Sequence, residues 1–159
     1  MPEFHPRLRA VGRVAILVSR YNELVTARLL EGARACCRAA GVPDGEIDVV
    51  WVPGAFELPV AAAAAAAAGR YRCLIALGAV IRGETPHFEY VAGETTRGLG
   101  EIALRHCLPV GFGLLTVDTL QQATERAGGS AGNKGYEAAE AALLAADAVA
   151  HLGGSDAQD

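Results

Sequence analysis

Continuous apolar runs alternate along this chain with longer segments of helical character. The apolar runs are 14–19, 47–52, 73–81 and 110–117. The run at 14–19 is apolar up to its last residue and predicts a strand that is covered on both faces of a sheet, and the other three runs predict further strands. The segments between and after them predict helices, which we expect at 23–40, from about 56 to 69, and at 88–106, 120–126 and 135–151.

This alternation of strand and helix predicts an α/β fold with parallel strands joined by right-handed crossovers. We expect one domain over residues 1–159, built as a three-layer sandwich: a four-stranded parallel sheet of flavodoxin-like type with helices on both faces. Residues 1–12 contain two prolines and are predicted to form an irregular arm, either disordered or paired with another chain. Residues 153–159 are predicted to be a frayed tail.

Local signals mark where the helices begin and end. Asn22 precedes the first helical segment and is predicted to be its N-cap, while Gly41 and Gly69 are placed to end the first two helices. Pro59 fits a first helical turn, where a missing N–H costs little. Residues 127–134 (AGGSAGNK) predict a glycine-rich turn before the last helix.

The carboxyl ends of parallel strands meet at one edge of a sheet, where open α/β folds bind their ligands. The most polar of these strand exits reads RGETPH at residues 82–87. His87 is a candidate for proton transfer because a neutral imidazole suits that task near pH 7. The alternative of a structural or solvent-exposed histidine stays open. His5, His106 and His151 lack such a setting and are expected on the surface.

Other strand exits add binding groups to this edge. Backbone N–H groups of residues 83–85 precede a helix and suit an anion, although Glu84 is an unusual neighbour for one. Tyr21, Phe56 and Phe112 either pack in the core or stack on a flat heterocycle. Glu57 either pairs with hydroxyl or ring N–H groups of a ligand or only matches the positive end of the helix that follows. Arg126 and Lys134 either bind a ligand or are solvated surface charges. No P-loop lysine motif or GxGxxG follows a strand, which argues against nucleoside triphosphates and dinucleotides.

Composition narrows the class of protein further. The net charge is −4 with no basic block, so neither nucleic acid nor an anionic membrane is an expected partner. The longest apolar run, at 58–68, is far shorter than the roughly 20 residues that span a bilayer. The cysteines have no metal-type spacing, and we expect them to be small buried thiols in a reducing cytoplasm. They are Cys36, Cys37, Cys73 and Cys107.

Six segments, in order, give the chain a resemblance to a known family. They read SRYN at 19–22, EGA at 31–33, PGAFELP at 53–59, LGAVIRGETPHFEYV at 77–91, PVGFGLLT at 109–116 and ERAGGSAGNKGYEAA at 125–139. The sequence resembles the 6,7-dimethyl-8-ribityllumazine synthase family of riboflavin biosynthesis. The resemblance implies a cytoplasmic transferase without metal or organic cofactor. It would condense 5-amino-6-(D-ribitylamino)uracil with 3,4-dihydroxy-2-butanone 4-phosphate to give the lumazine, phosphate and water.

The resemblance also implies roles for individual residues. His87 would be the catalytic acid and base. The ribitylaminouracil would bind to Tyr21, Asn22, Ala55, Phe56, Glu57, Ala79, Val80, Ile81 and Phe112. The butanone phosphate would bind to Glu84, Thr85, Arg126 and Lys134, with Glu137 supporting that end. Phe112 and Arg126 would reach the site from a neighbouring subunit. Many relatives have Phe or Trp where Tyr21 stands, and a small residue in place of Glu84.

The family forms pentamers, twelve of which close into an icosahedral shell in some members. The short turn at 128–135 matches the shell-forming type, whereas Pro6 removes a strand donor from the arm and disfavours its pairing. We favour a 60-subunit shell over a free pentamer, with riboflavin synthase as a possible partner. The alternative to an enzyme is a flavin-binding or shell-forming protein that keeps the fold without catalysis.

Overall fold

The computed structural model describes residues 1–154 and contains a four-stranded parallel sheet in the order β2-β1-β3-β4. The strands are β1 (Val14–Ser19), β2 (Ile47–Val52), β3 (Cys73–Ile81) and β4 (Val110–Val117). All four predicted strands are confirmed with their boundaries. Of the predicted frayed tail, residues 155–159 lie outside the described part of the chain.

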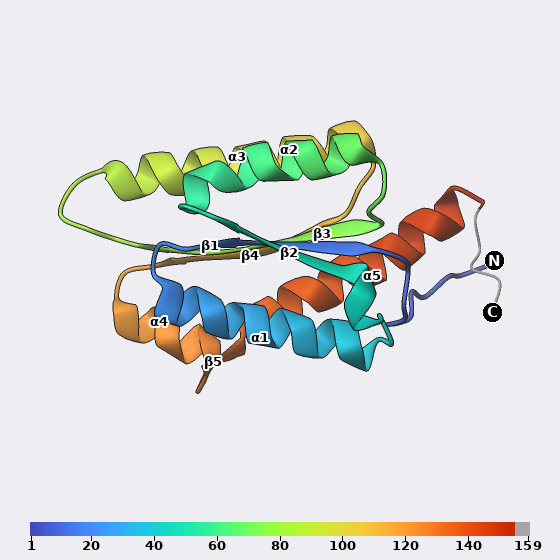
Figure 1. Ribbon diagram of the computed structural model, residues 1–159, viewed down its shortest axis with the longest axis horizontal. Helices are drawn as coiled ribbons and strands as arrows, with labels where there is room; N and C mark the ends of the chain where they lie inside the picture. Colours follow the sequence, from blue (N-terminus) through green and yellow to red (C-terminus); the bar gives the residue numbers. More distant parts are fainter. Residues whose placement is uncertain (155–159) are drawn as a thin grey trace.

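Helices cover both faces of the sheet, so the predicted α/β sandwich is confirmed (Figure 1). One face carries α1 (Glu23–Ala39), α4 (Leu120–Arg126) and α5 (Lys134–Leu152). The other carries α2 (Leu58–Ala68) and α3 (His87–His106). Two 3-10 turns, η1 (Asp44–Glu46) and η2 (Ala55–Glu57), flank β2. The glycine-rich segment holds a small antiparallel pair that the sequence did not predict, β5 (Ala127–Gly129) and β6 (Gly132–Asn133).

The two central strands are buried because each side of the sheet has its own apolar core. Ile16 and Val18 of β1 point into the core beneath α1 and α5. Ala15 and Leu17 alternate with them into the core beneath α2 and α3. A strand with an apolar residue at every position is therefore the type that fits between two helical layers. This packing holds the strand exits at one fixed edge.

The start of α5 approaches α1 so closely that only glycine fits at the crossing. A Cβ on Gly135 would overlap the backbone carbonyl of Leu29, and one on Gly32 would overlap the side chain of Asn133. Asn133 caps α5 by accepting from the N–H groups of Gly135 and Tyr136 at 2.8 and 3.1 Å. Its amide also donates to the carbonyl of Arg28 at 3.1 Å. These contacts fix the segment between α4 and α5 relative to the sheet.

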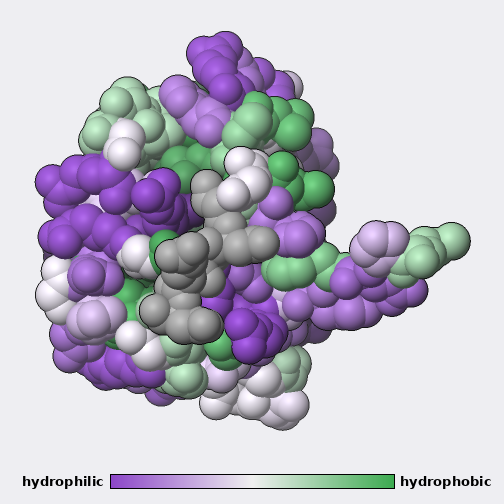
Figure 2. Space-filling view, turned by 90° about the vertical axis from the view of Figure 1, so that its right-hand side faces the viewer, coloured by the Kyte–Doolittle hydropathy of each residue, from purple (hydrophilic) through white to green (hydrophobic). Residues whose placement is uncertain are grey.

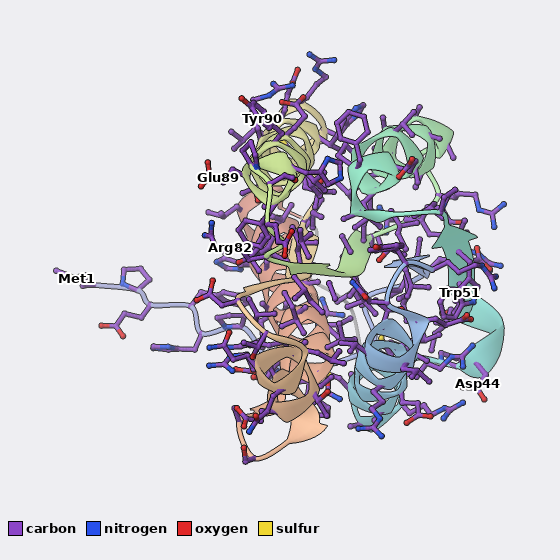
Figure 3. The ribbon with its side chains drawn as sticks, turned by 90° about the vertical axis from the view of Figure 1, so that its left-hand side faces the viewer. Met1, Asp44, Trp51, Arg82, Glu89 and Tyr90 are labelled. Carbon is purple, nitrogen blue, oxygen red and sulfur yellow. The ribbon has the colours of Figure 1, made fainter. Side chains whose placement is uncertain are left out.

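The N-terminal arm is irregular, as predicted, and is attached to α5 through a buried carboxylate and through the ring of Phe4, which stacks on His151 with 3.9 Å between the ring centres. Asp147 accepts from the N–H of Arg7 at 2.8 Å and from Nε of Arg9 at 2.6 Å. Burial alone would raise the pKa of Asp147, but these two donors outweigh it and the pKa is lowered. Beyond these contacts the arm extends from the body, with Met1 at its tip (Figures 2 and 3).

Two predictions about individual side chains need correction. Asn22 stands at the N-cap of α1, but in a left-handed conformation and without a side-chain capping bond. Cys107 is exposed, because it follows the last turn of α3 in a left-handed conformation. The other three cysteines are buried, and burial raises the pKa of Cys36 and Cys73 to about 12 and that of Cys37 to about 11. His5, His106 and His151 lie on the surface, as predicted.

No helix within residues 1–154 combines the length and the apolar character needed to cross a membrane.

Candidate functional site

A cavity of about 820 Å³ lies at the edge of the sheet where the strands have their carboxyl ends. Residues that follow β1, β2 and β3 line it, together with the first turns of α3. In the strand order β2-β1-β3-β4, the chain leaves β1 toward β2 on one side and reaches β3 on the other. The cavity therefore lies at the switch point where this class of fold binds ligands.

The exit of β1 is tied to both of its neighbours. The N–H groups of Arg20 and Tyr21 donate to the carbonyls of Val52 and Pro53 at 2.8 and 2.9 Å. The Asn22 amide donates to the carbonyl of Ala79 on β3 at 3.0 Å. The side chain of Asn22 therefore joins the exit of β1 to β3, which explains why it does not cap α1. The Tyr21 ring is left 74% exposed at the mouth of the cavity.

The exit of β2 forms η2, which supplies a carboxylate and an aromatic ring. Glu57 and Phe56 both line the cavity, and Phe56 is 58% exposed. Thr95, which is fully buried on α3, donates its hydroxyl to the carbonyl of Ala55 at 3.1 Å. A buried hydroxyl with a satisfied bond holds this turn in a defined place relative to α3.

The exit of β3 carries the polar segment that the sequence singled out. Ala79, Val80 and Ile81 form the cavity floor, and Gly83, Thr85 and His87 form one wall. His87 is the first residue of α3, one residue earlier than predicted, and its side chain is exposed. Glu84 is exposed and does not line the cavity, while its neighbours on either side do.

The cavity therefore combines exposed aromatic faces with a small set of groups able to transfer protons or form hydrogen bonds. Large apolar side chains that remain this exposed mark a binding surface. One imidazole and one carboxylate, those of His87 and Glu57, face the same space. Such a site can hold a flat polar ring between apolar surfaces and protonate or deprotonate it.

Nine of the predicted site residues line this one cavity within a single copy of the chain. They are Tyr21, Ala55, Phe56, Glu57, Ala79, Val80, Ile81, Thr85 and His87. Asn22 and Glu84 flank it in sequence, and Asn22 is bonded to its floor through Ala79.

Three predicted residues lie elsewhere. Phe112 is on the edge strand β4, with 49% of its surface exposed. Arg126 lines a second cavity of about 700 Å³ and donates to the carbonyl of Gln122 at 3.1 Å. Lys134 is exposed and pairs with Glu137 at 3.4 Å. A single copy does not bring these three into the main cavity.

Three residues on α3 line the cavity although the sequence analysis did not place them there. Tyr90 and Val91 lie three and four residues after His87, so all three share one helical face. Phe88 lines both cavities and forms part of the wall between them. The helical spacing from His87 was the signal that could have identified Tyr90 and Val91.

Within residues 1–154, no group of three or more His, Cys, Asp or Glu side chains is arranged to hold a metal ion. Comparison with known protein families gives a match to the 6,7-dimethyl-8-ribityllumazine synthase family over residues 12–150. The match covers both the sheet and every residue that lines the main cavity. This chain therefore belongs to the 6,7-dimethyl-8-ribityllumazine synthase family, whose members are transferases of riboflavin biosynthesis.

Proposed function

We propose that the protein condenses 5-amino-6-(D-ribitylamino)uracil with 3,4-dihydroxy-2-butanone 4-phosphate to give 6,7-dimethyl-8-ribityllumazine, phosphate and water. The observation that supports this is the composition of the main cavity, where aromatic faces, the Glu57 carboxylate and the His87 imidazole line one space of about 820 Å³. That volume suits two small substrates held side by side. No separate cofactor is needed, because the reaction transfers no hydride or electron.

The uracil ring is assigned to the apolar side of the cavity. Tyr21 stacks on the ring, and Phe56 with its neighbour Ala55 bounds it from the β2 exit. Glu57 accepts from hydroxyl or ring N–H groups, and residues 79–81 form the surface beneath the ring. Asn22 contributes by fixing the position of β1 against β3.

The phosphate is assigned to the segment that precedes α3. Backbone N–H groups at Gly83, Glu84 and Thr85 stand at the N-terminus of a 20-residue helix, where the helix dipole favours an anion. Arg126 supplies the counter-charge, and Lys134 with Glu137 supports this end. The phosphate thus lies close to His87, which transfers protons as the amine attacks the ketone and the phosphate leaves.

Phe112 and Arg126 complete the site from a neighbouring subunit. Their distance from the main cavity within one copy supports this, as does the exposure of Phe112 on an edge strand. We propose a cytoplasmic pentamer, assembled further into a 60-subunit shell, with riboflavin synthase as a possible partner. Light scattering of the purified protein should give the mass of 60 chains of 16.4 kDa. A mass equal to five chains would support a free pentamer and contradict the 60-subunit shell.

The activity is tested by mixing the purified protein with both substrates and following the absorbance of the lumazine. We expect product to form well above the spontaneous rate. Lumazine formation at only the spontaneous rate would contradict the proposed enzyme activity. Tight binding of a flavin in the same sample would then favour a flavin-binding protein that keeps the fold without catalysis. The RGETPH segment, with His87 in the cavity wall, favours the enzyme.

A further inference from the structure

Arg82 lies between the sheet and the segment that carries His87. It directly follows β3, and its backbone N–H donates to the carbonyl of Val117 at 2.8 Å. Its position is therefore fixed on the exits of β3 and β4. The side chain points away from the main cavity and lines the second one instead.

The guanidinium of Arg82 contacts groups on two different elements. Nε donates to Oδ1 of Asp118, just beyond β4, at 2.9 Å. Nη1 donates to Oε1 of Glu89, in the first turn of α3, at 3.4 Å. The guanidinium carbon also lies 4.5 Å from the ring centre of Phe88. Figure 3 shows Arg82 and Glu89 on the same side of the strand exits, close to the start of α3.

Between Arg82 and Glu89, Phe88 also packs against the core beneath α2 and α3, but the polar residues of the segment have few attachments. In residues 1–154, the side chains of Glu84, Thr85 and His87 form no hydrogen bond. The N–H of Glu89 donates to the carbonyl of Pro86 at 3.0 Å, which closes the first turn but ties it to nothing outside the segment. The direction of the His87 side chain therefore depends on where the first turn of α3 is held.

We propose that Arg82 is a positioning residue, which orients His87 toward the cavity by holding Glu89 and Phe88 against Asp118. This inference rests on the proposed function. The planar guanidinium has several donors in a fixed geometry, so it can hold two carboxylates and an aromatic face together. The ion pairs are exposed, so they contribute little to global stability. Their effect is on geometry, to which a proton transfer is sensitive.

Kinetics of Arg82→Met provide the first test. We expect kcat to fall roughly 10-fold, with KM for both substrates nearly unchanged, because the cavity is kept while the imidazole is misplaced. Asp118→Asn weakens the same contact from its other end and should give the same pattern. Arg82→Lys should recover only part of the rate, since an ammonium cannot hold both carboxylates in this geometry. Arg105→Met, which breaks a 2.6 Å ion pair with Glu101 on the same helix, should leave the kinetics unchanged.

A double-mutant comparison separates positioning of His87 from any other effect. If Arg82 acts through His87, adding Arg82→Met to His87→Ala should lower kcat less than about twofold further. Hydrogen exchange measured by mass spectrometry should show faster exchange for residues 83–92 in Arg82→Met, with no change elsewhere. A full additional loss of rate in the double variant, or unchanged exchange in this segment, would overturn the proposal. An inactive wild-type protein would instead overturn the proposed function, and the exchange measurement is independent of activity.

Discussion

Replacing Gly135 with alanine should destabilise the protein by about 3 kcal/mol, the largest effect we expect from a single methyl group. The added Cβ would overlap the carbonyl group of Leu29. That group belongs to the backbone of α1, so a rotamer change cannot relieve the contact. The two helices would have to separate, which would also weaken the contact from Asn133 to Arg28. Urea unfolding followed by circular dichroism, at one fixed protein concentration, measures the loss.

Gly45→Ala is the matched control for this change. Gly45 lies in the exposed turn η1, has no left-handed backbone, and a Cβ there would meet no atom within 4 Å. Its free energy of unfolding should stay within about 0.5 kcal/mol of that of the wild type. Equal midpoints for the two variants would show that α1 and α5 can move apart at no cost. The close crossing would then have no role in stability.

Replacing His87 with alanine should lower kcat roughly 10- to 100-fold, with KM for both substrates little changed. The imidazole lines the cavity wall, but the ring-stacking and phosphate-binding groups are separate residues. Substrates should therefore still bind, and the remaining rate would come from holding them together. Lumazine formation under steady-state conditions, with each substrate varied in turn, separates kcat from KM.

His106→Ala is the control, because it removes an imidazole from the opposite end of the same helix. His106 is exposed and lies far from the strand exits, so its removal should leave both kinetic constants as they are. A His87→Ala variant with the wild-type kcat would remove His87 from the mechanism. The binding roles of the remaining cavity residues would then have to account for the whole rate.

The four strands could be predicted to the residue because each is a mostly apolar run bounded by polar or turn-forming residues. Burial on both faces makes this pattern clearest in β1 and β3, whereas β2, at the edge of the sheet, has no buried position. A strand such as β3, with nearly every position covered, cannot carry the polar alternation of a one-sided sheet. The contrast with the polar segments that follow also located the strand exits, and with them most of the cavity wall. Helix ends were predicted within about two residues, because capping residues and glycines act locally.

Contacts between distant parts of the chain were not predictable in the same way. The glycine at 135 looks like any helix-starting glycine, and only the crossing of α1 explains why nothing larger fits. Asn22 is of a residue type that favours the N-cap of a helix, yet its amide donates to the carbonyl of Ala79, which is 57 positions away. In both places the role of the residue is set by a distant segment of the chain and not by its neighbours in the sequence.

The sequence alone thus determined the fold class, the strand boundaries and the segment that carries His87. Burial, helix periodicity and turn chemistry are local properties that a linear pattern records. The tertiary structure alone decided that Asn22 bonds to Ala79 and that Arg82 reaches both Asp118 and Glu89. These contacts depend on the relative placement of separate strands and helices, which two-sided packing sets and no single segment encodes.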